Sequence, residues 1–216
     1  MKVPMTSLIL LCLAAAFPLH AQEYMFTYSK LYSQMKNNAK EGHDDVRLGM
    51  FFLNAETKQL CPLTKAWMEK EEHYEELDTS GFEFKVPVDS NLKSANPLVY
   101  VQMGSEAQCD FSLVVMANEP FSGEVSYQEI ERLLPQMQIM LEDLGGMFAS
   151  WFTPDVEGVT LEFANGYNGS INASNGASFD IVDGRAYIEL AKLAPDASIK
   201  LPSPTTRVLP WLPNAK

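Results

Sequence analysis

Short apolar runs, several of them alternating strictly with polar residues, recur along most of the chain and constrain its fold more than any other feature. Alternation with a period of two is typical of strands that bury one face. In the first half of the chain such runs lie at 24–28, 46–52, 82–88, 98–103 and 111–116. Five short strands within about 95 residues predict a β-sandwich or a β-barrel.

Two of these runs carry a further signal. Apolar residues from Tyr28 to Met35 follow helical spacing, so the first strand is expected to continue into a turn or two of helix. Pro87 lies inside the run 82–88. Because proline donates no backbone hydrogen bond, that strand is expected at a sheet edge or to end there. The polar residues 89–91 are expected to form a loop.

The second half of the chain predicts fewer strands and one clear hairpin. Apolar residues alternate over 159–163. The runs 179–182 and 187–190 flank Asp183-Gly184, a dipeptide that favours the tight turn of a β-hairpin. Prolines near the end favour an edge strand or an irregular wrap over a central strand, namely Pro202, Pro204, Pro210 and Pro213.

One segment between these halves predicts an amphipathic helix. Ser126 and Glu129 have the spacing of a capping box, in which each side chain satisfies a free amide at the helix start. Gly145-Gly146 is a signal for the helix end. Pro135 lies in the interior, so a kink or a break is expected there. One face is apolar at helical spacing, through Ile130, Leu133, Leu134, Met137, Leu141 and Leu144.

The N-terminal segment has the layout of a secretory signal peptide. Lys2 precedes an uncharged apolar run from Leu8 to Phe17, and the small residue Ala21 follows at the expected cleavage site. The run is too short to span a bilayer, so cleavage after Ala21 is favoured over an uncleaved anchor. No later stretch approaches the roughly 18 apolar residues of a membrane-spanning helix. We therefore expect an exported protein that does not span a membrane.

Charge and composition exclude two broad classes of protein. Cleavage after Ala21 leaves 195 residues with a net charge of −13, because the removed segment holds one lysine and no acid. A chain this acidic is unsuited to general nucleic-acid binding, which needs a basic surface. Hydrophobic residues make up 46% of the sequence, enough for a packed core, so wholesale disorder is excluded.

The cysteine count favours a disulfide. Cys12 belongs to the expected leader, which leaves Cys61 and Cys109. Two thiols in an exported chain allow one intramolecular pairing in an oxidising compartment. The closed loop would hold 49 residues. For a loop of this size, the loss of entropy in the unfolded chain stabilises the fold by roughly 4 kcal/mol. The alternative is a pair of buried thiols. A metal site has less support, because no CxxC motif or histidine cluster accompanies the cysteines.

These observations together predict an α+β, mostly β protein. We expect a disulfide-stapled, β-sandwich-like N-terminal module over 22–122 and an amphipathic helix with its connector over 123–153. A smaller C-terminal β-module is expected over 154–216.

The chain also resembles a known family. The residues that carry the resemblance are Phe26-Thr27-Tyr28-Ser29-Lys30-Leu31-Tyr32, the two cysteines around Val86-Pro87-Val88-Asp89, the helix from Glu129 to Leu144, and Leu161-Glu162-Phe163-Ala164-Asn165. Together they are similar to exported Gram-negative bacterial proteins grouped as a domain of unknown function. The resemblance implies a periplasmic location and supports the cysteine pair. It implies no activity and carries over no functional residue.

Histidine is scarce, which limits the catalytic possibilities. Only His43 and His73 follow the leader, and the sequence has no G-x-S-x-G elbow, H-E-x-x-H motif, P-loop or G-x-G-x-x-G loop. His43-Asp44-Asp45 combines an imidazole with two carboxylates, which could bind a metal or act as an acid–base pair. Adjacent side chains seldom converge on one centre, however, and Gly42 precedes them. A solvated turn is therefore expected.

The segment from Glu69 to Asp78 is strongly acidic. Its carboxylates could bind a divalent cation, although no Asp/Asn/Gly calcium-loop spacing is present. A solvated acidic face is expected instead. Paired carboxylates in a hydrolase remain an alternative, because their spacing is spatial and cannot be recognised in the sequence.

A methionine-rich and aromatic stretch is the candidate binding surface. Methionine adapts to varied apolar partners, so such a surface could hold a lipid tail, a peptide or a helix of another protein. The favoured interpretation is nevertheless that these residues pack in the core, with the helix held between the two β-modules. The residues of the stretch are Met137, Met140, Met147, Phe148, Trp151 and Phe152.

The function that these observations favour is a non-catalytic binding or scaffolding protein of the cell envelope. Its partner would be an envelope protein, a peptide or an apolar ligand, and no cofactor is expected. The alternatives are a periplasmic hydrolase with paired carboxylates and an acidic cation-binding module. A deep cleft with convergent acids would favour the hydrolase, whereas an exposed apolar groove or a free sheet edge would favour the binder.

Overall fold

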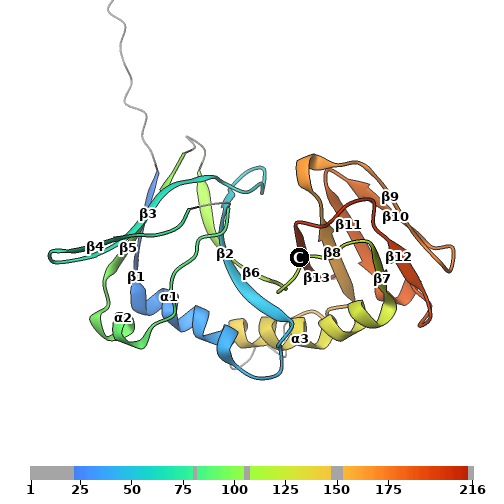
Figure 1. Ribbon diagram of the computed structural model, residues 1–216, viewed down its shortest axis with the longest axis horizontal. Helices are drawn as coiled ribbons and strands as arrows, with labels where there is room; N and C mark the ends of the chain where they lie inside the picture. Colours follow the sequence, from blue (N-terminus) through green and yellow to red (C-terminus); the bar gives the residue numbers. More distant parts are fainter. Residues whose placement is uncertain (1–21, 80–81, 105–107, 147–152, 214–216) are drawn as a thin grey trace, which may run out of the picture.

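Helix α3 (Tyr127–Gly145) joins two β-rich modules in the computed structural model of the chain (Figure 1). The structure describes residues 22–79, 82–104, 108–146 and 153–213. The N-terminal module precedes α3 in the sequence, and most of the C-terminal module follows it. This architecture confirms the predicted α+β, mostly β fold class.

The N-terminal module contains a four-stranded and a two-stranded sheet. The four-stranded sheet has the order β1-β5-β3-β4, and β2 pairs with β6 over nine residues, with all pairs antiparallel. The strands are β1 (Glu23–Thr27), β2 (Val46–Asn54), β3 (Leu63–Lys70), β4 (His73–Glu76), β5 (Leu98–Met103) and β6 (Cys109–Ala117). The helical segments are α1 (Tyr28–Met35), η1 (Lys36–Ala39) and α2 (Ser90–Ala95). The predicted change from strand to helix at Tyr28 is confirmed.

A disulfide bond joins the two sheets of the N-terminal module. Cys61 lies just before β3 and Cys109 begins β6, and their Cα atoms are 6.4 Å apart. Both side chains are buried in the same apolar cluster as Tyr28, Phe52 and Phe84. The predicted pairing is confirmed, and the bond lies in the core of the module that it stabilises.

The C-terminal module is built around one seven-stranded sheet. Its order is β13-β8-β11-β10-β9-β12-β7, with every pair antiparallel. The strands are β7 (Glu124–Ser126), β8 (Gly158–Glu162), β9 (Gly169–Ala173), β10 (Ser178–Val182), β11 (Arg185–Glu189), β12 (Ser198–Lys200) and β13 (Arg207–Trp211). The short 3-10 turns are η3 (Ala164–Gly166) and η4 (Leu190–Lys192). The proline-rich end supplies β13, which is an edge strand as expected.

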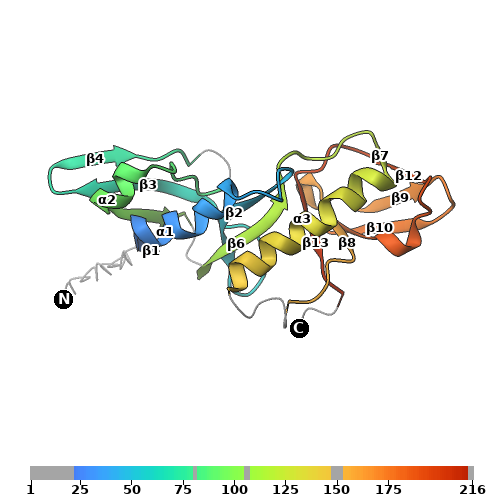
Figure 2. The same ribbon diagram turned by 90° about the horizontal axis from the view of Figure 1, so that it is seen from below.

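Helix α3 packs against both modules. Ser126 and Glu129 form the predicted capping box, and hydrogen bonds from Ser126 lower the pKa of the Glu129 carboxyl. A kink or a break was expected at Pro135; the helix continues through it, so there is no break. Its buried face lies in one apolar cluster with residues of β2, β6 and the seven-stranded sheet. Figure 2 shows the helix running from β6 to the C-terminal sheet.

Residues 82–88 do not form the predicted strand. The backbone N–H of Phe84 donates to the carbonyl of Met50 at 2.8 Å, but no ladder continues from this contact. Pro87 has no N–H to donate, and its carbonyl accepts a hydrogen bond from the hydroxyl of Tyr28 at 2.6 Å. The segment is therefore an extended stretch that packs over β2. The alternation of apolar residues indicated that side chains of this stretch are buried, but it did not indicate strand pairing.

Residues 90–95 form helix α2 where a loop was expected from residue 89. A carboxylate oxygen of Asp89 accepts from the backbone N–H groups of Asn91 and Leu92, at 2.6 and 3.1 Å. Asp89 is therefore the N-cap of this short helix.

Candidate functional site

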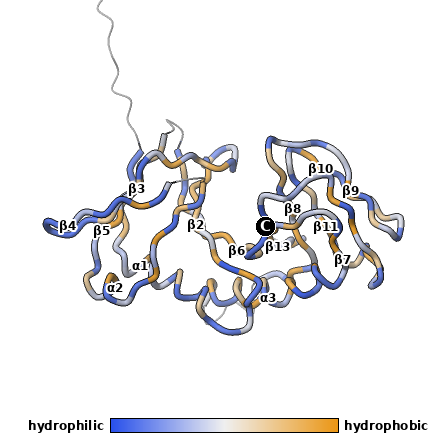
Figure 3. Tube along the Cα trace, viewed as in Figure 1, coloured by the Kyte–Doolittle hydropathy of each residue, from blue (hydrophilic) through white to orange (hydrophobic). Residues whose placement is uncertain are grey.

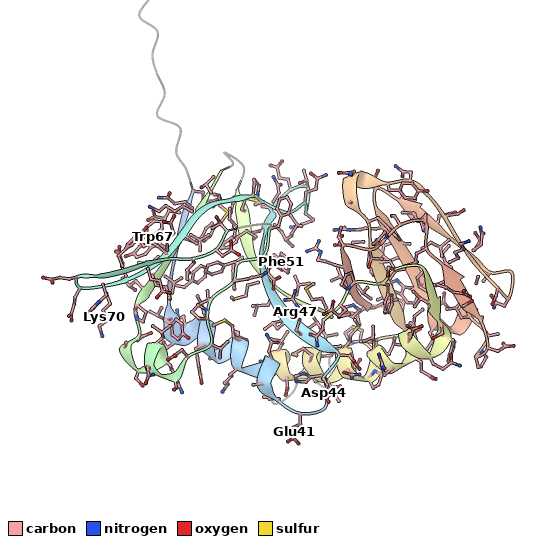
Figure 4. All side chains as sticks on the ribbon, viewed as in Figure 1. Glu41, Asp44, Arg47, Phe51, Trp67 and Lys70 are labelled. Atoms are coloured by element: carbon pink, nitrogen blue, oxygen red, sulfur yellow. A yellow bond between two sulfur atoms is a disulfide. The ribbon has the colours of Figure 1, made fainter. Side chains whose placement is uncertain are left out.

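A cleft of about 600 Å³ lies between the two modules. We call it the inter-module cleft. Its N-terminal wall comes from β2, β6 and two connecting segments, and it consists of Arg47, Phe51, Gln59, Leu60, Phe82, Glu83 and Met116. Its C-terminal wall comes from β8, η3, the β10–β11 turn and β13, and it consists of residues 162–166, 183–185, 206 and 207. Figure 4 labels Arg47 and Phe51 on the N-terminal wall.

Arginine is concentrated in this cleft. The sequence holds only four arginines against 28 acidic residues. Three of the four, Arg47, Arg185 and Arg207, line the cleft although they lie far apart in the sequence. The cleft is therefore much less acidic than the rest of a chain whose net charge is −12.

Side chains alternate between the two faces of strand β2, and one of these faces contributes to the N-terminal wall of the cleft. Leu48, Met50 and Phe52 point into the two apolar cores, so Arg47 and Phe51 point to the opposite face. Gly49 lies between those two, where a Cβ atom would come within 2.7 Å of the Phe51 ring and 3.2 Å of the Glu83 carboxylate. Glycine at this position therefore leaves room for the side chains that form the wall.

Arg47 is held by Glu83. Two guanidinium nitrogens donate to the two carboxylate oxygens, and the Nη2–Oε2 distance is 3.0 Å. A paired geometry of this kind fixes the plane of the guanidinium as well as its position.

Glu162 binds two arginines at once. Strand β8 lies between β11 and β13, and the sheet register places Glu162 opposite both Arg185 and Arg207. Nε of Arg185 lies 3.0 Å from Oε1, and Nε of Arg207 lies 2.6 Å from Oε2. The Glu162 side chain is only 8% exposed. Because an unpaired buried carboxylate is costly, both guanidinium groups are expected to stabilise the sheet here.

The two walls meet through one cation–π contact. The guanidinium carbon of Arg207 lies 4.9 Å from the centroid of the Phe51 ring. One side chain thus contacts Glu162 in its own module and Phe51 in the other, which links the two walls.

The sequence-predicted binding surface is not where the cleft lies. Met137 and Met140 are fully buried in the core beneath α3, where they contact the surrounding apolar cluster. Met147, Phe148, Trp151 and Phe152 lie outside the described residues. The Cys61–Cys109 pair is buried in the N-terminal core and does not line the cleft.

His43 is buried, which corrects the expected solvated turn. It is 2% exposed, and its Nε2 atom has no hydrogen-bond partner among the described residues. The segment folds back onto α3, because the side chain of Gln136 bonds both the backbone N–H and the carboxylate of Asp45. Of this cluster, Asp44 is exposed and Asp45 is partly exposed.

The acidic segment forms the exposed β3–β4 hairpin. Its residues 71–76 are all exposed, in agreement with the predicted solvated face, and the end of the hairpin is hydrophilic in Figure 3. In the described part of the chain, no three His, Cys, Asp or Glu side chains are grouped closely enough to hold a metal ion.

Comparisons with known proteins place the chain in one family. The family model that matches it spans residues 20–163 and is described as Protein of unknown function (DUF2987). The matched region covers the N-terminal module, α3 and β8, and ends at Phe163 on the C-terminal wall of the cleft. No curated protein and no solved structure matches the chain. No helix within the described ranges has the length and hydropathy required to cross a membrane.

Proposed function

The chain belongs to the DUF2987 family of unknown function, and from this premise we propose that it is an exported, non-catalytic protein that binds a ligand in the inter-module cleft. The observation that carries the proposal is the concentration of arginine there, with three of the four arginines of an acidic chain on its walls. Side chains brought together from three distant segments are typical of a site that recognises a ligand.

The size and lining of the cleft support a small ligand or the end of a chain. A volume of about 600 Å³ falls in the range of roughly 300–1,000 Å³ typical of small-molecule sites. The walls combine apolar side chains such as Phe82 and Leu60 with a few fixed charges. Phe82 is 46% exposed, so it is available to a ligand without rearrangement of the core.

A hydrolase has less support than a binding protein. Glu83 and Glu162, two of the acids in the cleft, accept hydrogen bonds from arginines on both carboxylate oxygens. An oxygen engaged in this way is poorly placed to receive a proton from a substrate. The described lining includes no histidine, cysteine or serine that could act with them.

Export is part of the proposal. A disulfide is consistent with an extracytoplasmic protein, and the leader-like segment 1–21 accounts for the route. The periplasm of a Gram-negative bacterium is the proposed location. The mass of the protein purified from that compartment should equal residues 22–216 less two hydrogens.

The binding proposal is tested by filling the cleft. Ala164 is exposed, belongs to η3 and lines the cleft, whereas Ala191 is exposed in η4 of the same module and lies outside it. We expect the neutral fluorescent probe N-phenyl-1-naphthylamine to bind the mature protein and Ala191→Trp equally, and Ala164→Trp much more weakly. Equal binding to all three proteins would place the probe elsewhere and would count against the proposal.

A further inference from the structure

Arg185 differs from the other two arginines of the cleft in the donors it leaves free. Arg47 uses Nη1 and Nη2 on Glu83, and Arg207 uses Nε and Nη2 on Glu162. Arg185 uses only Nε, on Glu162. No described residue accepts a hydrogen bond from its Nη1 or Nη2, and its side chain is 46% exposed.

The free nitrogens of Arg185 form an edge that can bind a carboxylate through two hydrogen bonds. The Nη1 and Nη2 groups of a guanidinium can donate two parallel hydrogen bonds to the two oxygens of one carboxylate. Glu162 accepts a hydrogen bond from Nε and so restrains the position of the guanidinium, which makes it a positioning residue. A ligand carboxylate would therefore meet an anchor whose position is already restrained.

The local charge balance also favours an anion. Glu162 carries one negative charge against the two guanidinium groups that it binds. Asp183 lines the same cleft two positions before Arg185, but it makes no ion pair with that residue among the described contacts. Over the whole lining the three arginines face three acids, so the positive excess is confined to the Arg185–Glu162–Arg207 group.

Apolar side chains adjoin this group. Phe82 and Leu60 lie on the opposite wall, whereas Phe163, which follows Glu162, is buried in the core. A ligand bound at Arg185 would therefore extend along apolar surface, and an uncharged polar body would lose hydration there without compensation.

We propose that the inter-module cleft takes a ligand with a carboxylate on an apolar body, anchored through Nη1 and Nη2 of Arg185. This inference rests on the proposed function. The ligand is either an amphipathic free acid, such as a fatty acid, or the carboxyl end of an apolar peptide. Both present the same chemistry to Arg185.

Two pairs of fluorescent probes test the anchor and separate these sources. Dansyl-phenylalanine represents a peptide end and 11-(dansylamino)undecanoic acid represents a fatty acid, and each is compared with its own neutral amide. We expect the preferred acid to bind about tenfold to a hundredfold more tightly than its amide, the range for hydrogen bonds to a charged group. The tighter acid identifies the source.

Substitutions of single arginines test whether Arg185 is the residue that makes the acid bind more tightly than its amide. Arg185→Gln should abolish the advantage of the acid over its amide, and Arg185→Lys should retain part of it, because lysine keeps the charge but not the paired donors. Arg132→Gln is the matched control, since Arg132 is the remaining arginine and lies on α3 outside this cleft. Melting temperatures confirm that each variant is folded.

The outcomes separate this inference from the proposal beneath it. Equal binding of acids and amides, still abolished by Ala164→Trp, would overturn the carboxylate anchor and leave the cleft as the binding site. Binding of the acids that Arg185→Gln does not weaken would also overturn the anchor. If Ala164→Trp weakens the binding of none of the probes, both the carboxylate anchor and the proposed binding cleft are overturned.

Discussion

Arg207 places its guanidinium carbon 4.9 Å from the centroid of the Phe51 ring, and this contact joins the last strand of the C-terminal module to β2 of the N-terminal module. The same guanidinium binds the buried carboxylate of Glu162. One side chain therefore contributes to the stability of the seven-stranded sheet and to the spacing of the cleft walls. The cleft is a consequence of how the two modules meet, and α3 lies along both of them (Figure 1) and shares one apolar cluster with residues of each.

Removing Arg207 should be more harmful than removing Arg185. The Arg207 side chain is 13% exposed and that of Arg185 is 46% exposed. We expect Arg207→Ala to lower the free energy of unfolding by about 3 kcal/mol, the lower end for breaking a buried pair, because Arg185 still binds Glu162. Arg185→Ala should cost less than about 1 kcal/mol, as for an exposed pair. Urea denaturation measures both, and equal losses would contradict this ranking.

The disulfide should act as a single unit. Cys61→Ser and Cys109→Ser should each lower the free energy of unfolding by roughly 2–5 kcal/mol, the range for losing a native disulfide in a small secreted domain. The double variant should lose little more than either single one, because all three break the same bond. Chemical denaturation of the three proteins provides the comparison, and additive losses would mean that the two sulfurs stabilise the fold separately.

The turn between β10 and β11 should depend on glycine for two reasons. Gly184 has φ of +78°, and a Cβ atom there would lie 2.8 Å from the carbonyl oxygen of Phe163. Gly176 has φ of +89° but nothing within 4 Å of such an atom, so it is a control for backbone strain alone. We expect Gly176→Ala to cost about 1 kcal/mol and Gly184→Ala about 2–3 kcal/mol in thermal or urea unfolding. A cost at Gly184 no greater than at Gly176 would show that the carbonyl moves away freely.

Two neighbouring residues of α3, one buried and one exposed, allow a matched comparison of substitutions. Met140 is fully buried and its neighbour Ile139 is 41% exposed. Met140→Ala should lower the free energy of unfolding by roughly 2–5 kcal/mol, whereas Ile139→Ala should cost less than about 1 kcal/mol. The measurement is again urea denaturation. Similar small effects would mean that α3 is peripheral to the core that joins the modules.

Local patterns predicted most of the fold. The change at Tyr28, the capping box at Ser126 and the Asp183-Gly184 turn each depend on residues close in sequence, and each is present. The disulfide followed from the number of cysteines. The run 82–88 was misassigned because alternation reports which side chains are buried, whereas a strand also requires a partner edge with free hydrogen-bonding groups.

The candidate site could not be predicted in the same way. Arg47, Arg185 and Arg207 come together only through the packing of β2 against the C-terminal module and through the register of three strands. One signal was present in the sequence, because the alternation that buries Leu48 and Met50 leaves Arg47 on the other face of β2. What lies opposite that face depends on contacts between distant segments, which no single-sequence pattern encodes.

Hydrogen–deuterium exchange with and without dansyl-phenylalanine tests the central claim most directly. If the inter-module cleft is the binding site, the probe should slow exchange on both walls, in segments around 47–51, 162–166 and 183–185. The exposed β3–β4 hairpin should be unchanged in the same experiment. Slower exchange confined to that hairpin, or to one module alone, would contradict a site formed between the two modules.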